Sequence, residues 1–367
     1  MKFCVITYDE YINIPYVQKY EKIFKENGIA HDIILWDRTG NGSEVSPYAT
    51  NNYIFKSKTN ASKLSKIVPF IKWRCFTKEI LRNNTYDGLI VCTTTPGVIL
   101  TDILTKHYRG KFILDIRDYT HEHISFFKKI AQKNIRAAGL VTISSEGFKR
   151  WLPDDISPVV THNISNTESA ETLVPNFDKS GPLTIGFVGG VRYFEENKKL
   201  IDGFANNSKF KLLYIGKHHP GGNLKEYCEA KLIENVEFRP RFDNSQKPSI
   251  YKQIDFINSV YGAESEETRS LLPNRLYDCI LFKKPIIVSM GTYLESVVDE
   301  YNLGIAIDTK RGNLPGQLGE YVAEFDSSCF LEGCEDYLGK VRRDEITFEG
   351  EVVCFLSRIA KENRYEK

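Results

Sequence analysis

Short apolar runs alternate with amphipathic stretches along this chain, and no other feature constrains its fold as strongly. Continuous apolar runs separated by helical stretches are typical of parallel β-sheets covered by helices on both faces. One series of such runs lies within residues 1–165, and a second series starts with the run at 184–188. The sequence therefore predicts an α/β protein with two Rossmann-like domains that face each other across a cleft.

A polar segment separates the two series. Residues 166–182 are rich in Asn, Ser and Thr and close on Gly-Pro, which is the composition of a linker. We therefore expect an N-terminal domain over 1–165 and a C-terminal domain over 183–345. The last residues, 346–367, have the pattern of an amphipathic helix that could pack back on the first domain.

Composition excludes several classes of protein. A net charge of +1 over 367 residues argues against wholesale binding of nucleic acid. No apolar stretch approaches the ~20 residues of a transmembrane helix, and the first ten residues indicate a strand rather than a signal peptide. The eight cysteines are scattered without a metal-site spacing, so we expect free thiols in a cytoplasmic protein that holds no metal.

The stretch "PNRLYD" at 273–278 begins a predicted helix and points to a ligand. Unpaired N–H groups at a helix start favour phosphate, whereas an acid one turn further in, Asp278, suits hydroxyl groups. A nucleotide sugar carries both kinds of group. The alternative is that Asp278 is a surface acid that pairs with a nearby lysine.

A second candidate for phosphate binding follows the apolar run at 184–188. Gly189 and Gly190 allow the backbone to approach a ligand closely, and Arg192 and Lys198 flank the next helix start. The alternative is that both cations are solvated surface residues, because the dinucleotide fingerprint G-x-G-x-x-G is absent.

Four segments in a fixed order carry a family resemblance. They read "FILDIRDYTHEH" (112–123), "VVTHNISN" (159–166), "IGFVGGVRYFEENKKL" (185–200) and "LLPNRLYDCILFKKPIIVS" (271–289). Together they resemble glycosyltransferase family 4, including bacterial surface-polysaccharide members with the two-domain GT-B architecture. The resemblance implies transfer of a hexosyl or N-acetylhexosaminyl group from a UDP- or GDP-linked donor to a saccharide acceptor, with no cofactor.

The resemblance also implies residue roles in the donor site. Asp278 falls on the family's acid that binds the ribose hydroxyls. Arg192 and Lys198 fall on the pair that neutralises the donor diphosphate, and Asn274 and Arg275 lie at the mouth of the donor pocket. The remaining candidates are at the strand-end segment "FRPRF", where the family holds the base; they are Arg241 and Phe242.

The sequence departs from the family pattern at three positions. Ser270 replaces a first glutamate, the second acid is shortened to Asp278, and Lys283 replaces the usual glycine. Three acids lie upstream and could substitute for the first glutamate only if their loop folds back; these are Glu264, Glu266 and Glu267. No Asp-x-Asp motif is present, so we expect cationic side chains, not a metal, to stabilise the leaving group. Retention of the anomeric configuration is implied by the resemblance.

Acceptor chemistry is expected in the first domain. Asp118 and His121 follow a predicted strand, and a histidine can bind or deprotonate an acceptor hydroxyl. The alternative is that both are polar loop residues before the next helix. The loop "VCTTTPG" at 91–97 and the pair His218 and His219 are weaker candidates.

Residues 55–83 form a basic, aromatic-bearing stretch in which eight Lys and Arg oppose one acid. Such a stretch can lie on an anionic membrane surface, which would suit a lipid-linked acceptor and a peripheral protein. The alternative is a solvated helix whose apolar side faces the core. The favoured function is synthesis of capsule, O-antigen or exopolysaccharide; a nucleotide-sugar 2-epimerase and an inactive nucleotide-sugar-binding homologue stay open, the latter favoured by Ser270.

Overall fold

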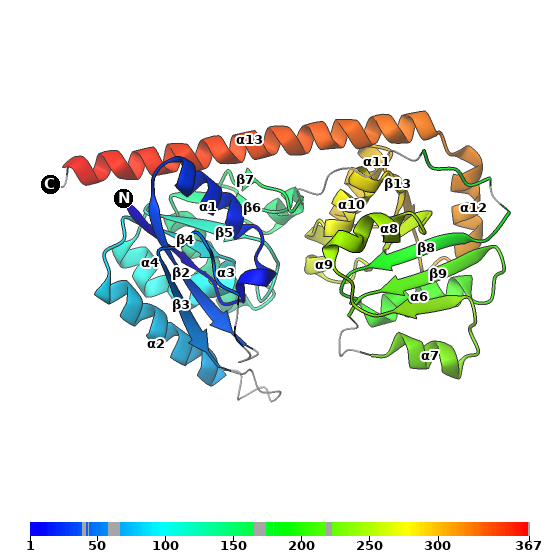
Figure 1. The fold of residues 1–367 in the computed structure, drawn as a ribbon, viewed down its shortest axis with the longest axis horizontal. Helices are drawn as coiled ribbons and strands as arrows, with labels where there is room; N and C mark the ends of the chain where they lie inside the picture. Colours follow the sequence, from blue (N-terminus) through cyan, green and yellow to red (C-terminus); the bar gives the residue numbers. More distant parts are fainter. Residues whose placement is uncertain are drawn as a thin grey trace. The chain divides into compact units, whose positions relative to one another are not determined.

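The structure is a computed structural model that describes residues 1–38, 42, 44–57, 67–164, 174–178, 180–217 and 222–365 (Figure 1). The chain divides into two compact units. Unit 1 comprises Met1–His162 with Arg343–Lys367, and unit 2 comprises Asn163–Arg342. Each unit contains one parallel β-sheet, so the predicted α/β class with two Rossmann-like domains is confirmed.

The sheet of unit 1 has seven strands in the order β3-β2-β1-β4-β5-β6-β7. Its strands are β1 (Lys2–Ile6), β2 (Ala30–Asp37), β3 (Asn51–Lys56), β4 (Gly88–Cys92), β5 (Phe112–Ile116), β6 (Leu140–Ile143) and β7 (Val159–Val160). Its helices are η1 (Tyr11–Asn13), α1 (Val17–Glu26), α2 (Ile67–Asn83), α3 (Thr94–Ile99), α4 (Thr101–His107), α5 (Ser125–Ala137) and η3 (Glu146–Arg150).

Apolar side chains project from both faces of this sheet. Along β1, Cys4 and Ile6 pack in one core cluster, whereas Phe3 and Val5 pack in another. Because side chains alternate across a strand, a strand that is apolar throughout must be covered on both faces. The continuous apolar runs of the sequence therefore have the structural role expected of them.

The sheet of unit 2 has six strands in the order β10-β9-β8-β11-β12-β13. Its strands are β8 (Leu183–Val188), β9 (Phe210–Ile215), β10 (Val236–Arg239), β11 (Phe256–Ser259), β12 (Ile286–Ser289) and β13 (Gly304–Ile307). Its helices are α6 (Phe194–Phe204), α7 (Leu224–Ala230), η4 (Asn244–Gln246), α8 (Lys247–Tyr251), α9 (Glu266–Ser270), α10 (Asn274–Phe282), α11 (Tyr293–Glu300) and α12 (Leu314–Glu324), followed by α13 (Ser327–Tyr365).

Helix α13 serves the cores of both units in turn. The helix expected from residue 346 begins at Ser327, because residues before 346 also carry apolar side chains at helical spacing. Phe330 and Tyr337 pack in the core of unit 2, whereas Phe348 and Phe355 pack in the core of unit 1.

One predicted segment, residues 55–83, differs in the structure, and several predicted residues lie outside the described part of the chain. The basic stretch at 55–83 is not one continuous element, since β3 ends at Lys56 and α2 begins at Ile67; its cations Lys58, Lys63 and Lys66 lie outside the described residues. So do His218, His219 and most of the predicted linker. Within the described part of the chain, no helix is long and apolar enough to cross a membrane.

Candidate functional site

The candidate site lies where the strand order of unit 2 changes direction. From β8 the chain proceeds to β9 and β10 on one side, and then returns to β11 on the other side. In parallel α/β sheets, ligands bind outside the carboxyl ends of strands at such a switch point. Here those ends are followed by Gly189–Gly190 after β8 and by Val260–Gly262 after β11.

The glycine turn after β8 depends on its residue type. Gly189 has φ of 120°, in the region that favours glycine, and a Cβ at Gly216 would lie 2.0 Å from the carbonyl oxygen of Gly189. A Cβ at Gly190, in contrast, would meet nothing within 4 Å. The turn is thus tightly packed against Gly216 on one side and open at Gly190 on the other. The backbone of Gly190 is therefore accessible to a ligand.

Arg275 lies buried directly beneath this turn. Its Nη1 donates to the carbonyl of Val188 (3.1 Å) and lies 4.0 Å from the position of a Cβ on Gly189. Its guanidinium also lies 3.7 Å from the centre of the Phe187 ring and donates to the hydroxyl of Tyr261. Only 8% of this arginine is exposed, and its Nε has no hydrogen-bond partner in the part of the chain that the structure describes.

The charge of Arg275 has no anionic partner among the described residues. A buried charge without a counter-charge is costly, because burial removes its hydration and no ion pair replaces it. The guanidinium presents a planar fork of donors, which matches the oxygens of phosphate groups. An anion bound at the glycine turn would therefore complete this site.

The two cations predicted to bind the diphosphate have different surroundings. Arg192 is exposed, and its guanidinium makes no hydrogen bond or ion pair with any described residue. Lys198 pairs with Glu195 (3.1 Å), and its ammonium lies over the rings of Phe194 and Tyr227 at 5.4 and 5.0 Å. Arg192 is thus available to a ligand as it stands, whereas Lys198 would have to leave its present contacts.

Asp278 is buried, and its carboxylate is already bonded within the protein. It is 3% exposed and lies in the second turn of α10, where both of its carboxylate oxygens are bonded. Lys247 Nζ contacts them at 2.8 and 3.1 Å, and the hydroxyl of Tyr251 donates to one of them at 2.7 Å. The alternative of a surface acid that pairs with a lysine is therefore wrong about the surface position, because α8 packs against this face of α10; the lysine partner, Lys247, is present.

The other predicted donor residues are at the surface. Asn274 is the exposed first residue of α10, whose preceding residue, Pro273, provides no side-chain cap. Arg241 is exposed, and Phe242 is partly buried against the core of unit 2.

The structure joins Tyr193 and Glu267 by a hydrogen bond that was not predicted from the sequence. The hydroxyl of Tyr193 donates to Glu267 Oε1 at 2.9 Å, and the Tyr193 ring packs 4.7 Å from the ring of Tyr261, which itself contacts Arg275. Burial, together with the neighbouring carboxylate of Glu267, raises the pKa of Tyr193, so the phenol keeps its proton and donates.

Ser270, which stands where the resemblance expects an acid, does not present its hydroxyl to a ligand. It is fully buried, and its hydroxyl donates to the carbonyl of Glu266 at 2.5 Å. Glu267 lies three residues earlier, on the same face of α9, and is joined to the turn after β8 through Tyr193. Among the described residues, no group donates to its second oxygen.

In unit 1, the strand order changes direction between β1 and β4. Thr93 follows β4 with φ of 70°, which is strained for a β-branched residue and is found most often at functional sites. The hydroxyl of the next residue, Thr94, donates to the buried carboxylate of Glu122, which also accepts from the backbone N–H of Thr120 (2.6 Å). The sequence reading missed the part played by Glu122.

Asp118 and His121 precede α5 rather than lie on it. Their segment is not helical. Both are exposed, and the His121 ring lies 5.5 Å from the ring of Phe127 and 6.3 Å from that of His123. Over the described residues, no group of three His, Cys, Asp or Glu side chains could hold a metal ion.

Comparison with solved structures places this geometry in a known architecture. Sucrose-phosphate synthase from Thermosynechococcus elongatus is 11% identical, with full coverage of both chains and a TM-score of 0.71. The chain has the GT-B fold. HepE of Anabaena, in complex with UDP, is 14% identical over 98% of this chain and 100% of its own, with a TM-score of 0.67.

A third GT-B structure extends the likeness. The lipopolysaccharide outer core galactosyltransferase WaaB is 16% identical over 95% of this chain and 99% of its own, with a TM-score of 0.64. No protein-family model matches the sequence, and no curated protein matches it either. Similarity to known proteins is therefore carried by the fold.

Proposed function

We propose that this protein is a glycosyltransferase that uses a nucleotide-sugar donor, bound at the carboxyl ends of β8 and β11. The observation that carries the proposal is the buried guanidinium of Arg275, which lacks a described counter-charge and lies beneath the open glycine turn. Structures of similar fold carry UDP or UDP-glucose, as HepE does, which supports the same class of ligand here.

Charge stabilisation is the proposed source of catalysis. When the anomeric bond breaks, its electron pair stays on the terminal phosphate of the nucleoside diphosphate. Arg275 and Arg192 would stabilise that growing charge, and Lys198 could join them after leaving Glu195. The acceptor oxygen then forms the new bond to the anomeric carbon from the same face, and its proton passes to the departing phosphate. No metal is needed for this scheme.

The remaining donor contacts are proposed for two acids. The Asp278 carboxylate makes three contacts to Lys247 and Tyr251, and a carboxylate offers about four acceptor positions, so one is left for a ribose hydroxyl. Glu267 is proposed to accept hydroxyl groups of the transferred sugar, in the role that Ser270 cannot fill. Asn274, Arg241 and Phe242 remain proposed donor contacts at the surface.

The acceptor is proposed to bind unit 1, where His121 and Asp118 are exposed after β5. Helix α2 begins with three exposed apolar residues, Ile67, Val68 and Ile71, each more than half exposed. An apolar helix start beside many cations is suited to the surface of an anionic membrane, which supports a lipid-linked acceptor and a role in surface-polysaccharide synthesis.

The proposal is tested by incubating the purified protein with a panel of UDP- and GDP-linked sugars. We expect slow release of the nucleoside diphosphate from one donor, with the sugar released as free sugar when no acceptor is present. An epimerised sugar nucleotide would favour the 2-epimerase instead, and no reaction with any donor that demonstrably binds would favour an inactive homologue.

A further inference from the structure

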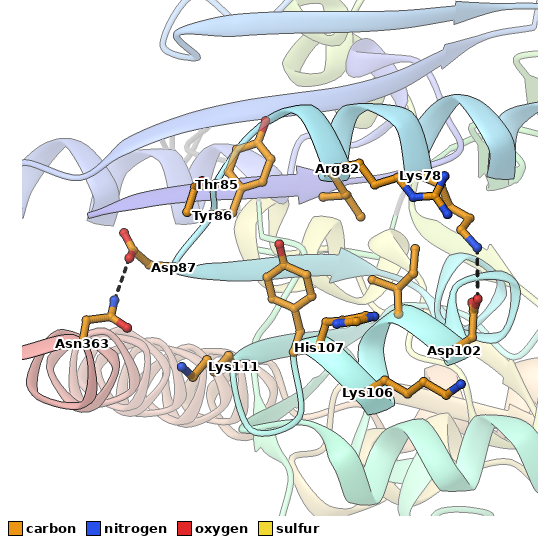
Figure 2. Close-up of a pocket in the computed structure, with 13 residues that line it drawn as sticks. Lys78, Arg82, Thr85, Tyr86, Asp87, Asp102, Lys106, His107, Lys111 and Asn363 are labelled. Atoms are coloured by element: carbon orange, nitrogen blue, oxygen red, sulfur yellow. Dashed lines mark hydrogen bonds and ion pairs between the residues drawn. The ribbon is translucent and has the colours of Figure 1, made fainter. Parts of the chain in front are cut away.

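A cavity lies at the amino-terminal ends of the strands in the sheet of unit 1, opposite their carboxyl ends (Figure 2). Asp87 directly precedes β4 and Lys111 directly precedes β5, so the cavity opens at the amino-terminal edge of these strands. Its walls come from the last turns of α2, from α4 and from the end of α13. Its volume is about 600 Å³, within the usual range of small-molecule sites.

The walls of the cavity are fixed by contacts within unit 1. Asp102 of α4 pairs with Arg74 (2.8 Å) and Lys78 (3.2 Å) of α2. Asp87 accepts from the side chain of Asn363 on α13 at 2.6 Å, and from the backbone of Lys2 at 2.6 Å. Both carboxylates of the lining are therefore already satisfied by the protein, and the cavity exists before any ligand arrives.

The rim of the cavity carries excess positive charge. Four cationic side chains line it, Lys78, Arg82, Lys106 and Lys111, against the two carboxylates of Asp87 and Asp102. The C-termini of α2 and α4 also face this edge, and each contributes about half a negative charge. An excess of about one positive charge remains, before protonation of His107 is counted. Arg82 and Lys106 are exposed and form no ion pair with any described residue.

Part of the cavity lining is apolar and aromatic. Leu81 and Ile103 contribute buried aliphatic surface, and Tyr108 contributes a half-buried ring. Burial raises the pKa of Tyr108 to about 12, so its hydroxyl stays protonated at neutral pH and can donate to an anion. In Figure 2 the Lys78 and Arg82 side chains come from one wall and those of Lys106 and His107 from another.

We propose that this cavity binds a small phosphorylated molecule with an apolar body, at a site separate from the donor site of unit 2. The phosphate would contact Arg82 and Lys106, and the body would cover Leu81, Ile103 and Tyr108. A volume of 600 Å³ is much larger than a lone phosphate needs, which is why an apolar body belongs to the proposal. The phosphate can belong to a soluble monoester or to a lipid headgroup.

Calorimetric titration with phenyl phosphate tests the site in the full-length protein. We expect saturable binding to the wild type, roughly tenfold weaker binding of inorganic phosphate, and at least tenfold weaker binding of phenyl phosphate to an Arg82→Ala/Lys106→Ala variant. The matched control is Lys209→Ala/Lys225→Ala, which removes two exposed cations from unit 2 and should bind like the wild type. Melting temperatures establish that each variant is folded.

Two further measurements show where the ligand binds and which kind of molecule carries the phosphate. Hydrogen exchange should slow on binding in the last turn of α4 and near Asn363, and not at 189–192. Sedimentation with vesicles of phosphatidylcholine, with and without phosphatidic acid, separates the sources: retention that requires Arg82 and Lys106 assigns the site to a lipid headgroup, whereas phenyl phosphate binding alone assigns it to a soluble monoester. Absence of binding to the wild type, or equal binding to the Arg82/Lys106 variant, would overturn the proposal.

Discussion

At the scale of single residues, the carboxylate of Asp278 is held by two neighbours before any ligand is present. We predict that Asp278→Asn lowers the free energy of unfolding by about 1–3 kcal/mol, because it leaves the mostly buried side chain of Lys247 without its counter-charge. Urea denaturation measures the change. Asp336→Asn, an exposed acid on α13, is the control and should unfold like the wild type. Equal stability of both variants would show that the Lys247 contact contributes nothing.

Glu267 offers the second prediction at this scale. Glu267→Gln keeps the side-chain shape and the bond from Tyr193, but removes the charge that we assign to recognition of the sugar. We expect kcat/KM for the donor to fall roughly tenfold or more, while affinity for the free nucleoside diphosphate stays within about twofold.

The control for Glu267 is Glu264→Gln, because Glu264 is exposed and pairs with Lys310 at the surface. A parallel loss of diphosphate affinity in Glu267→Gln would place this acid at the nucleotide rather than at the sugar.

At the scale of elements, the end of α10 shows how one departure from the family pattern is accommodated. Lys283 has φ of 52°, a left-handed conformation that favours glycine, yet its ammonium donates to Glu335 of α13 at 2.6 Å. Lys283→Ala loses the ion pair and keeps the strained backbone, whereas Lys283→Gly loses the ion pair and relieves the strain.

We therefore predict that the Gly variant is more stable than the Ala variant by about 1 kcal/mol. Thermal and urea unfolding of the two proteins, compared under identical conditions, provide the measurement. An Ala variant as stable as the Gly variant would mean that the turn after α10 relaxes at no cost.

Elements with a strong periodic signal could be predicted, and elements defined by distant contacts could not. The buried runs of β1 and β8 are continuous and apolar, so their strands were evident in the sequence. Strand β3 carries no such signal because it lies at the sheet edge with mostly half-exposed residues, and β7 carries none because it has only two residues.

In the candidate site too, local sequence signals could be predicted, whereas contacts between distant residues could not. Gly189 and the start of α10 were evident as local signals. The contact of Tyr193 with Glu267 joins residues 74 positions apart, and that of Asp278 with Lys247 spans 31, so neither can be read from spacing along the chain. The depth at which Arg275 is buried likewise depends on β8 and β11 together.

At the scale of the whole molecule, α13 contributes to the cores of both units. Phe348 is fully buried and packs edge-on against Tyr20 with ring centres 5.3 Å apart. We predict that Phe348→Ala lowers the stability of unit 1 by about 3–5 kcal/mol through the cavity that it leaves. Ile346→Ala on the same helix removes an exposed side chain and should change stability little.

Urea unfolding of the Phe348 variant should show a transition at lower denaturant concentration than in the wild type. Because the two units have separate cores, we expect a two-step profile in which the Phe348 substitution shifts only the step in which unit 1 unfolds. A single unshifted transition would contradict the role of α13 in the core of unit 1.

The central claim is that a nucleoside diphosphate, bound at the glycine turn, supplies the counter-charge of the Arg275 guanidinium. Titration calorimetry of UDP and of GDP into the wild type and into Arg275→Met tests it most directly. We predict that one of the two diphosphates binds the wild type and that the Arg275→Met variant binds it at least about tenfold more weakly. The melting temperature of the variant should not be lower than that of the wild type, because the substitution removes a buried charge that lacks a described counter-charge. Failure of both diphosphates to bind the wild type, or equal affinity in a folded Arg275→Met variant, would contradict the account.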